Sequence, residues 1–278
     1  MSPARSRRAH DWVSYDRVAD DYDRFLGANG YAALATDLLG LLSIPSGGSM
    51  LDVGCGTGAA GFAARKAVGA DGLVVGVDVS LAMLRRASVR AFSAVVTASL
   101  PDLPFRDAFF DGVAASLVLS HVEAYGAALR DMVRVVKPGG RVGVTAGARR
   151  QGPANPVYQL WVEAAESLVG RGALDEAGRS ALPWEVWFSD GANVATALAE
   201  AGLTGVQLER REYDVEMATS EYLSMFDVFA YGRFVREALG ERGWREFGER
   251  IRNVVAERCD PRTRYVARYH LGIGRKPR

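Results

Sequence analysis

The feature that most constrains this chain is a short apolar stretch that runs into three glycines at alternate positions. Residues 50–58 read Met-Leu-Asp-Val-Gly-Cys-Gly-Thr-Gly, and a second apolar run over residues 73–77 ends in Asp78. This order of strand, glycine turn, helix, strand and acid is typical of a parallel sheet that binds a nucleoside across the carboxyl ends of two strands. Glycine suits the turn because a ligand approaches its backbone closely and because φ becomes positive there. We therefore expect Asp78 to accept hydrogen bonds from ribose hydroxyls and Asp52 to hold an ammonium or amide group.

Two kinds of nucleoside cofactor compete for this turn. Gly56, Gly58 and Gly61 also match the G-x-G-x-x-G spacing of dinucleotide-binding folds. In those folds the first glycine directly ends the strand, whereas Gly54 and Cys55 intervene here. The placement argues against a dinucleotide, but an NAD(P)-dependent oxidoreductase stays open as an alternative, as does a turn that binds nothing.

The composition is that of a globular enzyme. The chain has 278 residues, of which 49% are hydrophobic and 24% charged, which suits one large domain with insertions. A net charge of +1 gives no bulk attraction to nucleic acid or an anionic membrane, and no apolar run approaches the ~20 residues that span a bilayer. Cys55 and Cys259 supply neither a disulfide framework nor a metal-ligand cluster. We expect a cytoplasmic monomer or homodimer without a metal, with a solvated basic tail over residues 1–10.

Alternating strands and helices indicate an α/β fold. Strands are expected over residues 50–54, 73–78, 92–97, 110–116, 141–146, 204–214 and 264–273. Helices are expected over residues 11–25, 31–42, 58–68, 80–90, 123–135 and 190–202. The sequence Lys137-Pro138-Gly139-Gly140 favours a type II turn before the fifth strand. The pattern predicts a Rossmann-like, mostly parallel seven-stranded sheet with helices on both faces.

Two helical insertions interrupt this alternation. We divide the chain into N-terminal helices that close over the cofactor (1–47), a cofactor-binding core (48–149), a lid insertion (150–189), a continuation of the core (190–217), a second lid insertion (218–260) and the last strand with its tail (261–278). Because the insertions bracket the sixth strand, we expect them to lie together over the carboxyl ends of the strands. Their aromatic side chains predict an apolar substrate pocket, or alternatively the core of a small cap: Trp161, Trp184, Trp187, Tyr222 and Phe226.

Residues 48–146 resemble the class I S-adenosylmethionine-dependent methyltransferases, and the flanking parts of the chain resemble them more loosely. The glycines of that family's first motif match Gly54, Gly56 and Gly58. Val77-Asp78-Val79-Ser80, followed by Met83, is similar to the second motif of one broad branch. That branch contains ubiquinone- and menaquinone-biosynthesis methyltransferases and many natural-product methyltransferases. The resemblance implies S-adenosylmethionine as cofactor, with Val79 and Met83 against its adenine.

The resemblance also implies a set of cofactor-binding residues. The set comprises Tyr15, Tyr22, Asp52, Gly54, Cys55, Gly56, Gly58, Asp78, Val79, Met83, Ser99, Leu100 and Ser116. Ser99 stands where the family usually carries an acid before Leu-Pro-Phe, and Asp102 is three residues out of register, so the contact with the adenine amino group stays open. Tyr15 and Tyr22 lie seven residues apart on one face of the first predicted helix. In the family such a helix closes over the cofactor and an aromatic hydroxyl reaches the methionine carboxylate; simple packing of the helix is the alternative.

His121 is the one candidate catalytic residue. It follows the fourth predicted strand, at the end of the sheet where the ligand is expected. In the resembling branch a histidine at this place often faces the donor methyl group. An ordinary histidine pKa of ~6.5 also suits removal of a proton from a hydroxyl. The alternative is a histidine that caps the next helix, whose first residues include Glu123.

The expected activity is transfer of a methyl group to a small, largely apolar acceptor, including natural products, by in-line displacement. Oxygen is favoured over nitrogen or carbon as the acceptor atom. Residues 116–119 read Ser-Leu-Val-Leu instead of the Asp/Asn-Pro-Pro-aromatic motif of adenine-type amino methyltransferases, and the same region has no carboxylates for a divalent metal. Positioning alone can contribute up to ~7–11 kcal/mol to catalysis. A non-methylating member of the fold, either a cyclase or a ligand-binding protein, is the other interpretation.

Overall fold

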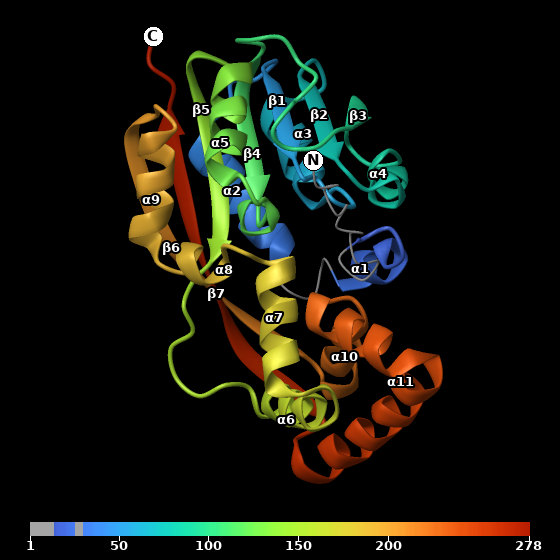
Figure 1. Ribbon diagram of the computed structural model, residues 1–278. Helices are drawn as coiled ribbons and strands as arrows, with labels where there is room; N and C mark the ends of the chain where they lie inside the picture. The colour runs from blue at the N-terminus through green and yellow to red at the C-terminus, as the bar shows by residue number, and fades with distance from the viewer. Residues whose placement is uncertain (1–13, 26–29) are drawn as a thin grey trace, which may run out of the picture.

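The computed structural model describes residues 14–25 and 30–278 (Figure 1), so the basic tail expected over residues 1–10 lies outside the described residues. Seven strands form one sheet in the order β3-β2-β1-β4-β5-β7-β6. The strands are β1 (Ser49–Val53), β2 (Leu73–Asp78), β3 (Ala94–Thr97), β4 (Phe110–Ser116), β5 (Val136–Gly147), β6 (Thr204–Ala218) and β7 (Arg262–Arg275). The α-helices are α1 (Ala19–Phe25), α2 (Tyr31–Leu42), α3 (Ala59–Val68), α4 (Leu81–Ala87), α5 (Tyr125–Val135), α6 (Pro156–Val169), α7 (Arg171–Ala181), α8 (Glu185–Phe188), α9 (Gly191–Glu200), α10 (Thr219–Ser224) and α11 (Ala230–Arg258). Two short 3-10 helices are η2 (Leu119–His121) and η3 (Met225–Asp227).

The sheet is mostly parallel. Strands β1 to β5 pair in parallel, whereas β7 runs antiparallel to both of its neighbours, β5 and β6. Helices α3, α4 and α5 form the crossovers of the parallel pairs β1–β2, β2–β3 and β4–β5. The expected Rossmann-like, mostly parallel seven-stranded sheet is confirmed.

Helices cover both faces of the sheet because the side chains of each buried strand alternate between them. In β1, Met50 packs with α2 and α3 on one face. Leu51 and Val53 point to the other face, where Leu129 of α5 and Leu198 of α9 belong to the same core. The apolar strands read from the sequence are therefore buried on both sides, and their carboxyl ends form the free edge at which a site can be built.

Most predicted boundaries differ from the structure by a few residues, and two of these differences have a local cause. Strand β5 begins at Val136 and includes the Lys-Pro-Gly-Gly segment, in which Gly139 has the positive φ of 81° that the expected type II turn needs. The first helix begins at Ala19, so Tyr15 lies in the turn before α1, contrary to prediction. The segment around Asp16 is held against α4 instead of continuing α1. The Asp16 carboxylate accepts hydrogen bonds from the Ser80 hydroxyl and the Ala82 N–H at the start of α4.

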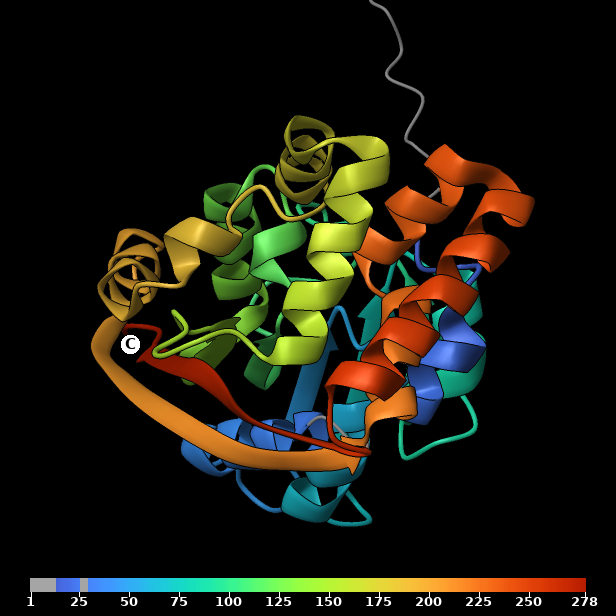
Figure 2. The same cartoon turned by 90° about the horizontal axis from the view of Figure 1, so that it is seen from below.

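The two insertions pack against each other at the carboxyl ends of the parallel strands (Figures 1 and 2). Strands β6 and β7 continue their pairing beyond β5, from the Glu212–Arg268 pair to the Ala218–Arg262 pair, and carry α10 and α11 outward. Helix α11 lies beside α6 and α7. They share one apolar core, which includes Val157, Trp161, Leu174, Tyr222, Phe226, Val235, Phe247 and Ile251. Gly240, with a φ of 66°, divides α11 into two helical parts. Among the described helices, none is both long and apolar enough to cross a membrane.

Candidate functional site

The glycine turn follows β1 directly, and its three glycines all have positive φ. The values are 65° at Gly54, 53° at Gly56 and 98° at Gly58. A Cβ added at Gly54 would lie 2.4 Å from the Val118 side chain, and one at Gly58 would lie 2.9 Å from Phe92. A Cβ at Gly56 would meet nothing within 4 Å. The chain's own packing therefore requires the outer two of the three glycines, while Gly56 borders open space.

Asp78 ties the glycine turn to the next strand. One carboxylate oxygen accepts the N–H of Gly56 at 2.9 Å and the other accepts the N–H of Ser80 at 2.9 Å. Burial raises the pKa of Asp78, and the backbone hydrogen bonds oppose that rise. A carboxylate has about four acceptor sites, so two accepted bonds leave capacity for ribose hydroxyls.

Asp52 is a buried carboxyl group without a hydrogen-bond partner on Oδ2. Only 2% of the residue is exposed, and burial together with the nearby Asp78 raises its pKa to about 8. The hydroxyl oxygen of Thr57, within the glycine turn, is likewise buried and unpartnered. Buried polar groups are normally satisfied, so this corner of the site is suited to a ligand that brings hydrogen-bond donors, and a cationic one above all.

The segment before α1 and α1 itself lie against α4. Besides the contacts of Asp16, ion pairs join Asp20 to Arg86 and Asp23 to Arg90. The ring of Tyr15 packs edge-on against Tyr22, with centroids 5.8 Å apart. This arrangement brings both predicted tyrosines near Asp78. Burial is the main cause that raises the pKa of each tyrosine, and the negative charge of Asp78 adds to the rise.

His121 ends η2 and packs edge-on against Tyr15, with ring centroids 5.8 Å apart. The backbone of Ala181, in the first insertion, accepts a hydrogen bond from it. Although His121 is exposed on one side, loss of solvent around its ring and, less strongly, the positive charge of Arg233 together lower its pKa to about 4. Helix α5 begins after Ala124 with no side-chain cap, so the structure gives His121 no helix-capping role. A neutral imidazole is the form that accepts a proton.

The other predicted cofactor residues have mixed surroundings. Val79 is 66% exposed, so its side chain is accessible to an apolar ligand, whereas Met83 is buried. Ser99 is exposed and Leu100 partly buried. Two residues face the protein instead. The Ser116 hydroxyl lies 3.0 Å from that of Thr145, and Cys55 packs with α4 in a small apolar cluster, so Cys55 offers a ligand only its backbone.

The five predicted substrate residues are mostly packed among themselves. Trp161 is 1% exposed and stacks on Phe226 with centroids 4.1 Å apart, in the shared core of the insertions. Tyr222 belongs to the same core. Trp184 and Trp187 lie against Tyr125 of α5, at centroid distances of 4.8 and 5.2 Å. The contacts of Trp161, Tyr222 and Phe226 are those of the alternative interpretation, the core of a small cap, whereas Trp184 and Trp187 pack against the core of the sheet.

Two residues near the predicted site carry no signal in the sequence. Arg233 of α11 is buried, and its guanidinium lies 4.3 Å from the centre of the Tyr15 ring. Glu185 begins the short helix α8, which is fastened next to His121 because the Trp184 N–H donates to Ser120 O at 3.3 Å. Burial raises the pKa of Glu185. A charged residue in a helix ordinarily faces water, so the burial of Arg233 is identified only by the tertiary structure.

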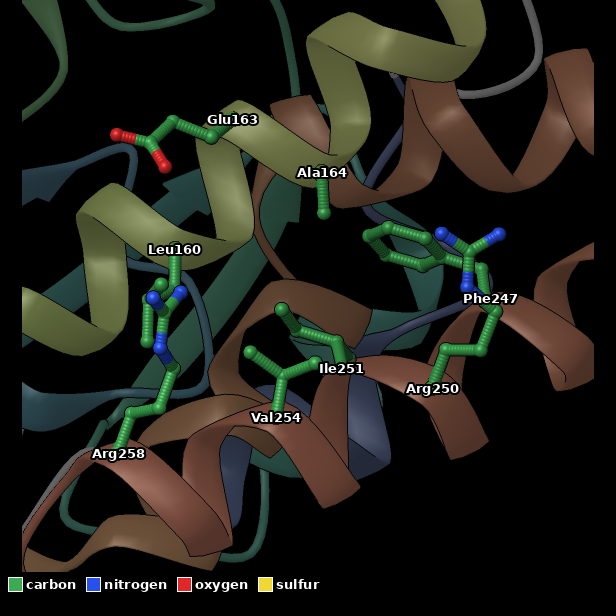
Figure 3. A pocket seen from close by; sticks show the side chains of 8 residues that line it. All are labelled: Leu160, Glu163, Ala164, Phe247, Arg250, Ile251, Val254 and Arg258. Atoms are coloured by element: carbon green, nitrogen blue, oxygen red, sulfur yellow. The ribbon is translucent and has the colours of Figure 1, made fainter.

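Two pockets lie elsewhere on the protein. A pocket of about 250 Å³ separates α6 from α11, and Figure 3 shows the apolar side chains of Phe247, Ile251 and Val254 facing α6 across it. A second pocket, of about 350 Å³, lies beside α3 and is lined by Asp23, Ala32, Thr36, Ala59, Phe62, Ala63 and Arg90. Asp52, Asp78 and His121 line neither of them. Within the described part of the chain, no group of three or more His, Cys, Asp or Glu side chains is arranged to hold a metal.

The sequence is similar to a methyltransferase family and to curated demethylmenaquinone methyltransferases. Residues 51–144 match the family described as "Methyltransferase domain". A demethylmenaquinone methyltransferase from Bacillus cereus is 32% identical over 151 residues, which cover 51% of this chain and 63% of that protein. The match thus spans less than two thirds of the relative.

Solved structures of low sequence identity share the whole fold. YcgJ from Bacillus subtilis superposes with a TM-score of 0.57 at 17% identity, over 88% of this chain and 99% of its own. A phosphoethanolamine N-methyltransferase 2 from Haemonchus contortus, solved with phosphomonomethylethanolamine and S-adenosylhomocysteine, has a TM-score of 0.55 at 15% identity, over 95% of this chain and 60% of its own. Together with the glycine turn and Asp78, these matches confirm the expected family: this chain contains a class I S-adenosylmethionine-dependent methyltransferase domain, in residues 51–144.

Proposed function

We propose that this protein is a methyltransferase that uses S-adenosylmethionine to methylate a small, largely apolar acceptor, with oxygen the favoured acceptor atom. The observation that carries the proposal is the unpartnered, buried carboxyl group of Asp52 beside the glycine turn. Asp78, on the neighbouring strand, is bonded to that same turn. An ammonium group and a ribose are the two ligand parts that these carboxylates suit best.

The residues fit this cofactor on three counts. Asp52 offers an acceptor to an ammonium group, Asp78 retains acceptor capacity for ribose hydroxyls, and Gly56 leaves open space beside the backbone. Exposed Val79 provides an apolar surface for an adenine ring. When bound, S-adenosylmethionine supplies a methyl group that its positively charged sulfur has already activated.

The protein's own contribution is to hold the acceptor, exclude water and receive a proton. His121 is neutral at neutral pH because its pKa is lowered to about 4, so its imidazole has a free nitrogen lone pair for a hydroxyl proton. The insertions cover the carboxyl ends of the strands (Figure 2), and we propose that they act as a lid that limits water at the acceptor. The relatives named for demethylmenaquinone support an apolar, cyclic acceptor.

The first test is calorimetric titration with S-adenosylmethionine, S-adenosylhomocysteine and NADH, together with native mass spectrometry of the purified protein. We expect the two adenosyl-sulfur compounds to bind and NADH not to bind. Binding of NADH alone would overturn the proposal and return the glycine argument to Gly56, Gly58 and Gly61. Tight binding of S-adenosylmethionine without methyl transfer to any acceptor in a broad screen would favour the non-methylating alternative, a cyclase or ligand-binding protein.

A further inference from the structure

Arg233 is a buried cation at the junction of three segments. It lies in α11 of the second insertion and is only 7% exposed. One terminal nitrogen donates to the backbone oxygen of Ser14, and the guanidinium lies 4.3 Å from the centre of the Tyr15 ring. Tyr15 in turn contacts His121. A side chain of the second insertion therefore contacts the segment before α1, directly beside the candidate catalytic residue.

The charge of Arg233 is not balanced within the described residues. Its Nε is buried without a hydrogen-bond partner, and its interactions are with Ser14 and Tyr15, neither of which is a carboxylate. Burial accordingly lowers the pKa of Arg233 below its usual range. An unpaired buried charge costs several kcal/mol, and a free guanidinium nitrogen is a donor suited to an oxyanion. The guanidinium is thus a buried donor that lacks a negatively charged partner.

The groups whose pKa values Arg233 affects indicate where in the site its partner would bind. Arg233 lowers the pKa of His121 after the larger effect of burial, and it opposes the rise that burial causes in the pKa of Tyr15. The pKa of Asp52 responds instead to burial and to Asp78. Arg233 thus acts on the side of His121 rather than on the side of Asp52.

We propose that Arg233 is an oxyanion receptor of the acceptor pocket, and that the acceptor is an apolar molecule bearing one acidic oxygen group, either a carboxylate or an acidic phenol or enol. This inference rests on the proposed function, since it assigns the substrate class of that same site. Arg233 is positioned for such a group because Ser14 holds one end of the guanidinium while Nε remains free. A negative group at this place would also neutralise the cation beside His121, which favours a proton on the imidazole.

The experiment uses paired aromatic probes that differ mainly in charge. With S-adenosylhomocysteine bound to the full-length protein, the affinities of 2-naphthoate and 2-naphthamide are measured by calorimetry. We expect the anion to bind about tenfold or more tightly than the amide, because hydrogen bonds to charged groups are the stronger ones. Arg233→Gln should abolish this preference, and Arg233→Lys should retain part of it. Replacing the amide by 2-naphthol above and below its pKa then separates the phenolate from the carboxylate as the preferred source.

Arg236 provides the matched control. It lies on the same helix but is exposed and paired with Glu241 at 2.9 Å, so Arg236→Gln should keep the preference for the anion. Melting curves of all three variants show whether they fold. If the wild type makes no distinction between the two probes, or if Arg233→Gln weakens both equally, the inference is wrong.

A third ligand separates the acceptor from the cofactor as the source of the oxyanion. Methylthioadenosine lacks the amino-acid end of S-adenosylhomocysteine. If Arg233→Gln weakens binding of S-adenosylhomocysteine but not of methylthioadenosine, the oxyanion is the cofactor's carboxylate and the acceptor assignment is overturned. If the wild-type protein binds neither compound, it is the proposed function that fails.

Discussion

At the scale of single residues, the site is marked by groups whose ordinary partners are missing. Asp52 is a buried carboxyl with a free oxygen, and Arg233 is a buried guanidinium with a free nitrogen. Arg233 is a cation, whereas Asp52, with a pKa of about 8, is a neutral acid at pH 7 until a cationic group binds beside it. Both groups lower the free energy of unfolding. A ligand that carries a group of opposite charge would offset this cost on binding.

Asp52 should couple ligand binding to proton release. Its pKa is raised to about 8, so the protein without ligand holds a proton there at pH 7, and a cationic ligand group favours its loss. Calorimetry of S-adenosylhomocysteine binding in buffers of different ionisation enthalpy should show proton release in the wild type and less in Asp52→Asn. Because the folded pKa exceeds the unfolded value of ~3.9, the stability that Asp52 contributes is lost as pH rises toward about 8. Equal proton release by the two proteins would contradict this role.

Asp78→Ala should weaken S-adenosylhomocysteine binding by about tenfold or more, because it removes acceptors for ribose hydroxyls at a cost of about 1–3 kcal/mol. It also frees the N–H groups of Gly56 and Ser80. Methylthioadenosine, which keeps the ribose, should lose affinity to a similar extent. Titration of both ligands measures the effect, and an unchanged affinity would remove Asp78 from the ribose site.

His121 should titrate far below an ordinary histidine. Burial and Arg233 lower its pKa to about 4, so its imidazole NMR signals should stay in the neutral form down to about pH 5. Because the folded pKa lies below the unfolded value of ~6.5, His121 removes stability as pH falls through that range. Arg233→Gln should raise the pKa. Once an acceptor is known, His121→Ala should lower turnover by about a hundredfold or more and leave cofactor affinity unchanged; turnover equal to the wild type would make it structural.

At the scale of elements, the glycine turn shows that one motif serves two purposes. Val118, from the end of β4, occupies the space that a side chain at position 54 would need, and Phe92 does the same at position 58. Only position 56 faces open space. The motif therefore allows the ends of β1 and β4 and the start of α3 to pack closely together. The space that remains for a ligand lies beside position 56.

Two alanine variants of this turn should behave differently. Gly54→Ala combines a φ of 65° with a contact of 2.4 Å, so it should lose about 1–2 kcal/mol to strain and about 1–3 kcal/mol more to overpacking. Gly56→Ala has a similar φ but free space, so it should lose only the strain while its affinity for S-adenosylhomocysteine falls. Thermal unfolding and calorimetry on both proteins provide the comparison. Equal loss of stability in both variants would show that the Val118 contact does not restrict position 54.

At the scale of the whole molecule, the two insertions are one body. Residues 157–174 and 215–255 contribute to the same apolar core, although some 40 residues, including α9, separate them in the chain. The β6–β7 extension carries this body, and Arg233 links it to the segment before α1. The body thus contacts both the sheet and the N-terminal segment, as a lid on the candidate site would.

Trp161→Ala should destabilise this body by about 3–5 kcal/mol, because it removes the largest of the fully buried side chains in residues 14–25 and 30–278, one that stacks on Phe226. The methyltransferase domain keeps its own core, so S-adenosylhomocysteine affinity should change less than 2-naphthoate affinity does. Exposed Val186→Ala serves as the control and should leave both unchanged. A Trp161→Ala protein with wild-type melting temperature would contradict the packing role.

Local sequence patterns were enough to predict the sheet, the glycine turn and the acid that ends the second strand. Strand periods, turn residues and glycine spacing act over a few residues, so β2, for instance, occupies the predicted residues 73–78. The first helix was predicted too long because its pattern does not show that Asp16 bonds to the start of α4, 64 residues along the chain.

Only the tertiary structure decided which side chains share the site. It placed Trp161 and Phe226 in a core, although an aromatic residue reads the same in a pocket and in a cap. It brought Tyr15, His121 and Arg233 together from three separate segments. A charged residue in an amphipathic helix ordinarily faces water, so its burial depends on long-range packing that no local pattern encodes.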